Sequence, residues 1–296
     1  MTSVPISLSL RGRSIAILSL IAAAGLTLVA QAPPTFRGGV DLVTVNVTVT
    51  DRSGHFVSGL TQDDFTVFED GQQRPIVYFE GEATPVSLGI LLDASGSMAE
   101  ATFAKLDLAR QLVARLVTHD LDSTAEWMFA RFTSAVVVAR EWTADREAIV
   151  QPLRETRATG DTSLYDAIAL SIPLVKEGHF QKKALLVVTD GGETRSLVTL
   201  EDVRKAIGES DVRVDGVGVR AKMDSLRTIA DETGGRTEAV NDAAAIPAAT
   251  ARIADQLRHQ YLLGYSTNAA KDDRPHAIRV AVRRGGLSLF SRRARS

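Results

Sequence analysis

One stretch of the chain combines an apolar run with a cluster of oxygen-bearing side chains. Residues 87–92 are mostly apolar, and Asp93, Ser95 and Ser97 follow at alternating positions. A carboxylate and two hydroxyls with this spacing on one turn direct their oxygens toward one point. Oxygen ligands suit a hard divalent cation such as Mg²⁺. The same residue types also cap helices, so this motif alone leaves a helix cap as an alternative.

Two more loops are predicted to bring oxygens to the same place. Thr162 lies just before a helix expected at residues 164–176, and Asp190 follows an apolar strand expected at residues 184–189. Parallel central strands end at the same edge of a sheet, and open α/β folds bind their ligands there. This context favours a metal site over a helix cap. The candidate metal ligands are Asp93, Ser95, Ser97, Thr162 and Asp190.

The elements that must position these residues alternate between strands and helices. This alternation predicts an α/β fold with a doubly wound, mainly parallel sheet and helices on both faces. The expected strands lie at residues 88–92, 184–189 and 212–219, with an antiparallel pair at 125–132 and 135–139. The expected helices lie at residues 101–117, 164–176, 200–208, 224–233 and 243–259.

Both ends of the α/β region are flanked by strand patterns. Strands are expected at residues 40–50, 65–69 and 76–79 before it, with a hairpin turn at Asp70 and Gly71 between the last two. After it, strands are expected at residues 260–266, 277–282 and 287–290. Each group is too small to bury its own apolar face. We therefore predict that the α/β domain, residues 85–260, is inserted in a small antiparallel β-sandwich. Residues 36–82 would form its first part, and residues 261–296 would complete it.

The first 32 residues are predicted to be a signal peptide. Arg11 and Arg13 precede an apolar run that ends in the small-residue sequence Ala30-Gln31-Ala32, which favours cleavage after Ala32. We expect a periplasmic or extracellular protein without a membrane span after cleavage. An uncleaved membrane anchor is the alternative. The chain has no cysteine, so an exported form would need no disulfide.

The composition excludes several classes of protein. With 296 residues, 45% hydrophobic and 24% charged, the chain is close to the average of soluble globular proteins. This argues against a disordered or multi-span membrane protein. The formal net charge is −2, and no part of the sequence resembles the basic face of a nucleic-acid-binding protein.

Three sequence segments together resemble a known metal site. They are Asp93-x-Ser95-x-Ser97, Thr162 in Gly-Asp-Thr-Ser-Leu-Tyr-Asp-Ala-Ile, and Asp190 in Val-Val-Thr-Asp-Gly-Gly. They resemble the metal-ion-dependent adhesion site (MIDAS) of the von Willebrand factor A domain. The resemblance covers about residues 85–260. Within this range the chain is similar to bacterial exported proteins with this domain.

The resemblance implies a Rossmann-like fold and a role for each of the five candidate ligands. In that family the two serines and the threonine contact the ion, and the aspartates act largely through bound waters. One coordination position is left for a carboxylate of the partner. The implied ion is Mg²⁺, with Mn²⁺ or Ca²⁺ as alternatives. Asp161 is a departure, because a second glycine is common there, and we expect it to add negative potential at the mouth of the site.

These features predict an exported, metal-dependent protein-binding module rather than an enzyme. Its partner would be a protein that supplies an acidic residue, and the oligomeric state is not predicted. A hydrolytic enzyme using the same ion would need a base or nucleophile nearby, for which the sequence offers only Asp161, Glu193 and Glu100. The last two are interpreted as solvated loop charges. A structural scaffold stabilised by the metal is the other alternative.

Overall fold

A computed structural model describes residues 41–53, 55–81, 84–99, 104–121, 125–221, 223–267 and 275–295. They belong to one compact unit, Gly39–Ser296. The predicted signal peptide, residues 1–32, lies outside the described residues. No helix within these described ranges is both long enough and apolar enough to cross a membrane.

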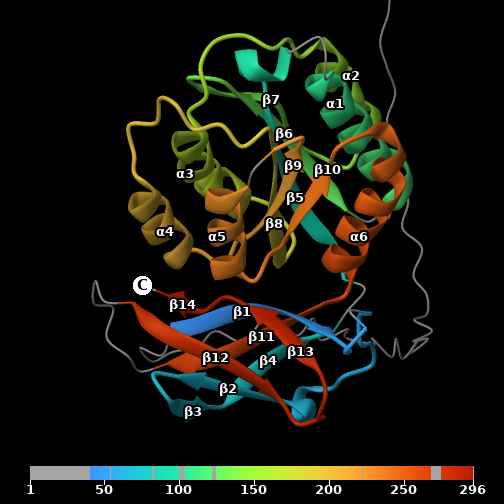
Figure 1. Cartoon of the computed structure of the whole chain (residues 1–296). Coiled ribbons are helices and arrows are strands. Elements are labelled where there is room, and N and C mark those ends of the chain that lie inside the picture. The colour runs from blue at the N-terminus through green and yellow to red at the C-terminus, as the bar shows by residue number, and fades with distance from the viewer. Residues whose placement is uncertain are drawn as a thin grey trace, which may run out of the picture. The chain divides into compact units, whose positions relative to one another are not determined.

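The centre of the fold is a six-stranded sheet with the strand order β10-β9-β8-β5-β6-β7 (Figure 1). β5 pairs in parallel with β6 and β8, β9 pairs in parallel with β8 and β10, and β7 is antiparallel to β6. The predicted mainly parallel sheet is confirmed. The strands are β5 (Val86–Asp93), β6 (Glu126–Phe132), β7 (Val136–Thr143), β8 (Lys182–Thr189), β9 (Arg213–Val219) and β10 (Thr237–Val240).

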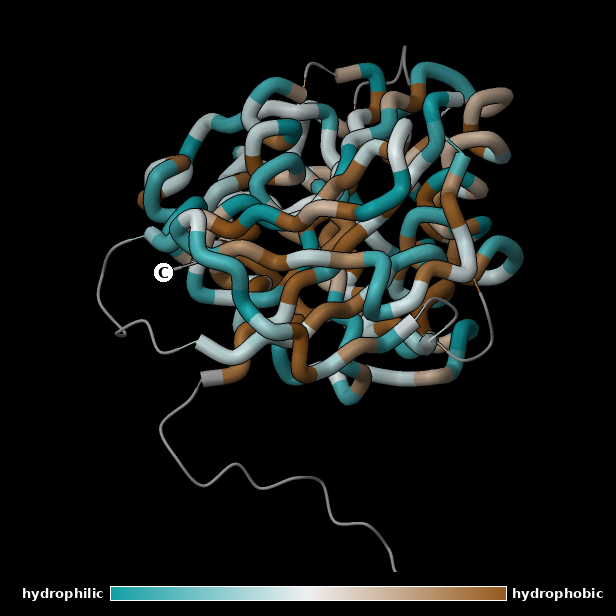
Figure 2. Tube along the Cα trace, turned by 90° about the horizontal axis from the view of Figure 1, so that it is seen from below, coloured by the Kyte–Doolittle hydropathy of each residue, from teal (hydrophilic) through white to brown (hydrophobic). Residues whose placement is uncertain are grey.

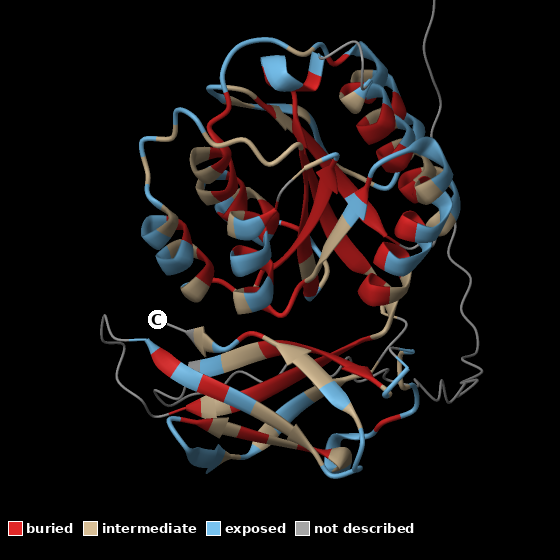
Figure 3. Cartoon of the chain, viewed as in Figure 1, coloured by how far each residue is buried: buried red, intermediate tan, exposed pale blue. Residues whose placement is uncertain are grey.

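Helices cover both faces of this sheet, as expected for a doubly wound fold (Figure 1). One face packs against α1 (Lys105–Arg115), α2 (Glu147–Glu155) and α6 (Ile246–Arg258). The other packs against α3 (Leu164–Lys176), α4 (Leu200–Gly208) and α5 (Asp224–Thr233). Figure 3 shows the consequence: the central strands are buried on both faces, whereas each helix exposes its outer side.

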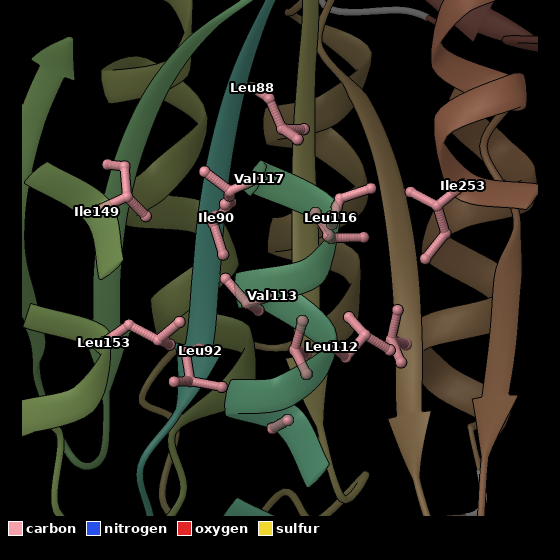
Figure 4. Close-up of a cluster of buried hydrophobic side chains, with 14 of the residues drawn as sticks. Leu88, Ile90, Leu92, Leu112, Val113, Leu116, Val117, Ile149, Leu153 and Ile253 are labelled. Carbon is pink, nitrogen blue, oxygen red and sulfur yellow. The ribbon is translucent and has the colours of Figure 1, made fainter. Parts of the chain in front are cut away.

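The burial explains why the central strands contain long apolar stretches without regular alternation. All residues of β5 and β9 are buried, so neither strand has a solvent face that would require alternating polar residues. Figure 4 shows Leu88, Ile90 and Leu92 of β5 within one cluster that also contains side chains from α1, α2 and α6. Alternate residues of a strand share one face, and each side chain buried in this way stabilises the fold by about 1.5–3 kcal/mol.

Two elements of this domain were missed by the sequence pattern. α2 contains Pro152, a residue that argues against a helix interior, yet Ile149, Val150 and Leu153 form a buried stripe that holds the helix in place. β10 has only four residues, too few to show an alternating pattern. The first predicted helix, residues 101–117, begins later in the structure, at Lys105, and residues 101–103 lie outside the described ranges.

The remaining strands form two antiparallel four-stranded sheets, and each contains strands from both ends of the chain. The predicted sandwich, built from both ends, is confirmed. One sheet has the order β13-β1-β11-β4, with β1 (Asp41–Thr50), β4 (Ile76–Glu80), β11 (Gln260–Thr267) and β13 (Ser288–Ser291). The other has the order β14-β12-β2-β3, with β2 (Phe65–Glu69), β3 (Gln72–Arg74), β12 (His276–Val282) and β14 (Ala294–Arg295).

The sandwich has its own apolar core. Val45, Val47 and Val49 of β1 pack with Tyr261 and Leu263 of β11 and with residues of the second sheet. Their alternation along β1 puts them on one face, which explains the alternating pattern read from the sequence. In Figure 2, hydrophilic segments lie at the periphery of the chain trace and apolar segments lie further inside.

The turn at Asp70 and Gly71 connects different strands from those expected. Both residues have positive φ, 51° and 78°, as a type I′ hairpin requires, and they join β2 to the unpredicted strand β3. The strand expected at residues 76–79 is β4, which belongs to the other sheet. The predicted hairpin turn is therefore confirmed, but the strand that follows it in the hairpin is β3 and not the predicted strand at residues 76–79.

Candidate metal centre

The carboxyl ends of β5 and β8 lie side by side at one edge of the central sheet. The parallel register runs from Val86 opposite Lys182 to Leu92 opposite Val188. Asp93 is the last residue of β5, and Asp190 directly follows β8. The two strands are thus parallel neighbours, which meets the condition under which their ends were expected to converge, and this register brings both carboxylates to the same edge.

Asp93 is completely buried and holds the loop that follows it. Its Oδ1 accepts a hydrogen bond from the Ser95 backbone N–H at 2.8 Å, and its Oδ2 accepts one from the Thr189 hydroxyl at 2.6 Å. Burial raises the pKa of Asp93 and outweighs these hydrogen bonds, which lower it, while the charge of Asp190 raises it further. A cation near this carboxylate would favour its ionised form.

The two serines link this loop to Asp190. Ser95 Oγ and Ser97 Oγ lie 3.1 Å apart, and the Ser97 hydroxyl donates to Asp190 Oδ1 over 3.1 Å. Ser95 is buried, whereas Ser97 is exposed in a short 3₁₀ turn, Gly96–Ala99. Four predicted ligands therefore form one hydrogen-bonded cluster that is open to solvent on one side.

Thr162 reaches the edge of this cluster from a separate loop. A β-carbon placed on Gly192 would lie 3.8 Å from Thr162 Oγ1 and 3.7 Å from Asp190 Oδ1, so both oxygens border this glycine. The loop is tied to the serine turn, because the Gly96 N–H donates to the Gly160 carbonyl at 2.8 Å. The five predicted residues thus lie around one place at the carboxyl edge of the sheet.

Lys105, which the sequence analysis did not identify, also contacts the cluster. Its Nζ lies 2.9 Å from Asp190 Oδ2, and the two side chains are only 14% and 4% exposed. The two residues are 85 positions apart in the chain, and no motif spacing connects them. A lysine ammonium beside an acidic residue is a feature that only the folded structure brings together.

Glu193 shapes the neighbouring loop, and its interpretation as a solvated charge was wrong. Its carboxylate accepts hydrogen bonds from the backbone N–H groups of Tyr165, Arg195 and Ser196 and from the Ser196 hydroxyl. Burial raises the pKa of Glu193, but these hydrogen bonds outweigh it and lower the pKa overall. Glu193 therefore fixes the loop after Asp190, while Glu100 lies outside the described residues.

Asp161 does not face the mouth as an uncompensated charge. Arg195 Nε lies 2.9 Å from Asp161 Oδ2, and both side chains are more than half exposed. The guanidinium offsets the negative potential that we expected from Asp161. The prediction that Asp161 makes the potential at the mouth of the site more negative was therefore wrong, because Arg195 neutralises its charge.

The donor set of the cluster fits a hard cation. It combines the carboxylates of Asp93 and Asp190 with hydroxyls, all oxygen donors, and a positive group, the Lys105 ammonium, already lies against it. Within the described ranges, no three or more His, Cys, Asp and Glu side chains gather as a metal-binding group. A cation at this edge would therefore depend on hydroxyl ligands as well as on carboxylates.

Residues 88–193 match a family model described as the von Willebrand factor type A domain, and this span contains all five candidate ligands. No curated protein matches the chain. Among solved structures, BatB from Bacteroides thetaiotaomicron, described as a conserved hypothetical protein, is 21% identical, with a TM-score of 0.50 over 58% of this chain and 98% of that chain. A mutant PilB minor pilin from Streptococcus sanguinis is 11% identical, with a TM-score of 0.50 over 64% of each chain. At these identities the likeness concerns the fold.

Proposed function

We propose that this chain, which carries a von Willebrand factor type A domain at residues 88–193, is an exported protein-binding module that uses a metal ion to bind an acidic group of a partner protein. The family match and the fold support an interaction role. The convergence of the oxygen donors at the carboxyl edge of the sheet is the observation that carries the metal-dependent part of the proposal.

Asp93, Ser95, Ser97, Thr162 and Asp190 would hold the ion, which we propose to be Mg²⁺, with Mn²⁺ or Ca²⁺ as alternatives. When bound, the ion would supply a positive charge that neutral hydroxyl ligands leave partly uncompensated, and a carboxylate from outside would be attracted to it. The partner is therefore proposed to be a protein with an exposed acidic side chain.

The chain's own residues prepare this site before anything binds. Asp93 orients the serine turn through the Ser95 N–H, and Thr189 holds the other oxygen of the same carboxylate. The Thr162 carbonyl accepts hydrogen bonds from the N–H groups of Thr194 and Arg195, which fixes the second loop. Donors that are already positioned lose less conformational entropy on binding.

A hydrolytic enzyme is less well supported than a binding module. Catalysis next to the ion would need a free base or nucleophile. Both oxygens of Glu193 accept hydrogen bonds from the loop, and Asp161 pairs with Arg195. These two residues therefore have structural partners where a catalytic base would need freedom to accept a proton.

Calorimetric titration with Mg²⁺ and Mn²⁺ tests the metal centre. We expect heat of binding with the wild type and none with Asp93→Ala. Asp231→Ala, which removes an exposed carboxylate on α5, should bind like the wild type. Equal titration of the wild type and Asp93→Ala would overturn the metal centre.

A pull-down from cell-envelope extract tests the binding role. The wild type in Mg²⁺ should retain a partner that EDTA releases and that Asp93→Ala fails to retain. Metal binding without any EDTA-sensitive partner would favour a structural scaffold instead.

Export is proposed from the sequence of residues 1–32 alone. Expression in a bacterial host, followed by N-terminal sequencing of the protein from the periplasm, should give a chain that begins at Pro33. A chain that keeps its first residues and stays with the membrane would instead identify an uncleaved anchor.

A further inference from the structure

Lys105 occupies an unusual position for a basic residue. It is the first residue of α1, its side chain is mostly buried, and its ammonium lies 2.9 Å from Asp190 Oδ2. Ala104, directly before it, has a φ of 44°, in the left-handed region that residues other than glycine rarely adopt. The chain therefore turns sharply just where it delivers this lysine to the cluster.

Both oxygens of Asp190 accept from donors of this chain. Oδ1 accepts from the Ser97 hydroxyl, and Oδ2 accepts from the Lys105 ammonium. A cation that binds at Asp190, directly or through water, must therefore displace one of these donors or share the carboxylate with it. Displacing the ammonium would break an ion pair that is largely shielded from solvent.

The charge of Lys105 also opposes the binding of a divalent cation at the cluster. The ammonium cancels one of the two carboxylate charges that Asp93 and Asp190 bring to the cluster. A divalent ion nearby would experience repulsion from this like charge. Such repulsion is strong at short range where water is largely excluded.

Lys182 provides a comparison within the same sheet. It begins β8 at the opposite edge, is completely buried, and donates to the Gly81 carbonyl at 3.0 Å. Lys182 thus has a neutral carbonyl oxygen among its acceptors, whereas Lys105 is paired with a carboxylate among the candidate ligands.

We propose that Lys105 is an internal counter-cation that competes with the divalent ion for Asp190. This proposal rests on the proposed metal centre and adds its regulation. Without a divalent ion, Lys105 stabilises the cluster by neutralising Asp190. With the ion, Lys105 lowers the affinity, so the ion binds weakly on its own and is retained better when a partner's carboxylate adds negative charge.

Titration with Mg²⁺ and Mn²⁺ of Lys105→Met, Lys105→Arg and the wild type tests this role. Lys105→Met keeps the apolar stem and removes the charge, so its Kd for Mg²⁺ should fall by about tenfold or more. Lys105→Arg keeps the charge and should stay within about threefold of the wild type. Lys183→Met, the same substitution near the opposite end of β8, is the matched control and should bind like the wild type.

A second readout uses no divalent ion. In EDTA, Lys105→Met should unfold at a lower temperature than the wild type, because Asp190 loses its ion pair, and Mg²⁺ should restore the loss. Lys105→Gln replaces Lys105→Met if the latter does not fold.

The outcomes separate the two proposals. If the wild type and Lys105→Met bind Mg²⁺ with the same affinity, or Lys105→Met binds more weakly, the competition is wrong and the metal centre stands. If every folded variant fails to bind Mg²⁺ and Mn²⁺, the metal centre itself is overturned, and the competition with it.

Discussion

The two edges of the central sheet both contain buried charged groups, but they satisfy them differently. At the amino ends of the strands, Arg213 and Asp215 form a bidentate ion pair, and Glu126 accepts from Ser87 and His179. At the carboxyl ends, acidic and hydroxyl oxygens gather around Asp190, and a lysine from another element provides the positive charge.

We interpret the amino edge as structural and the carboxyl edge as the proposed binding site, for two reasons. At the amino edge the opposite charges are neighbours in one strand, since Arg213 and Asp215 are two residues apart, and the Arg213 guanidinium also donates to Thr48 Oγ1 at 2.9 Å. At the carboxyl edge the set contains more acceptors than donors, and Ser97 is exposed. An arrangement of this second kind can accept a cation, whereas the first is already complete.

The largest effect should come from breaking the amino edge at Arg213. Arg213→Met removes the ion-pair partner of Asp215, which is 2% exposed, and leaves a buried carboxylate that keeps the hydrogen bond from the Arg236 backbone N–H but loses its bidentate guanidinium. We expect a loss of about 3–5 kcal/mol in the free energy of unfolding, measured with urea. The Kd for Mg²⁺ should stay unchanged if the variant is folded.

The exposed ion pairs of Arg204 supply the control for this change. Arg204 contacts Glu201 and Glu232 on the surface of α4 and α5, so Arg204→Met should cost less than about 1 kcal/mol. A similar loss for Arg213→Met and Arg204→Met would show that the amino edge does not depend on its buried pair.

The next largest effect concerns the carboxyl edge and the metal. At free Mg²⁺ about hundredfold above its Kd, the wild type should gain about 2.7 kcal/mol of stability relative to EDTA. Asp93→Asn keeps the size of the side chain and should gain nothing, because it removes the buried carboxylate. Thermal unfolding with and without Mg²⁺ measures both, and a Mg²⁺-dependent gain in Asp93→Asn would contradict the proposed ligand.

The strands and candidate ligands of the carboxyl edge could be predicted from the sequence, and the reason is physical. Buried parallel strands have long apolar stretches, so β5 and β8 stood out, and the polar residues that end them marked the loops. The structure shows that these strands are parallel neighbours, and it gathers the candidate ligands at one edge. That the cluster binds a metal stays a prediction.

The features that could not be predicted from the sequence depend on contacts between distant parts of the chain. Lys105 reaches Asp190 only because α1 starts beside the end of β8, which no local spacing encodes. The role of Glu193 depends on the conformation of its loop, where four donors surround one carboxylate. α2 is held by tertiary packing despite Pro152, so its local sequence argued against it.

A smaller effect should appear when the pH is lowered. Burial raises the pKa of Glu126, but the hydrogen bonds from Ser87 and His179 outweigh it, and the folded-state pKa is lowered overall. The stabilisation by Glu126 is therefore present above its unfolded-state pKa of 4.5 and is lost as the pH falls through the lower, folded-state pKa.

The variant Glu126→Gln isolates this contribution. Between pH 5 and pH 3 its stability should fall by about 1 kcal/mol less than that of the wild type, measured by urea unfolding at each pH. An identical pH dependence would show that the amino edge does not rely on the charge of Glu126.

The pH dependence that Asp93 contributes in EDTA has the opposite sign. Burial raises the pKa of Asp93 in the folded state, so its contribution to stability declines as the pH rises above its unfolded-state pKa of 3.8.

The smallest effect on stability should come from Ser97, where the comparison between the edges is most direct. Its hydroxyl is exposed and joins Ser95 to Asp190, so Ser97→Ala should change the free energy of unfolding in EDTA by less than about 0.5 kcal/mol. A ligand of the ion must nevertheless matter for binding, and we expect the Kd for Mg²⁺ to rise about tenfold in calorimetric titration. Ser87→Ala at the amino edge should show the reverse, since its buried hydroxyl donates to Glu126 and lies far from the candidate ligands along β5. If Ser97→Ala weakens the fold but not the binding of Mg²⁺, then the carboxyl edge is a structural cluster of the same kind as the amino edge.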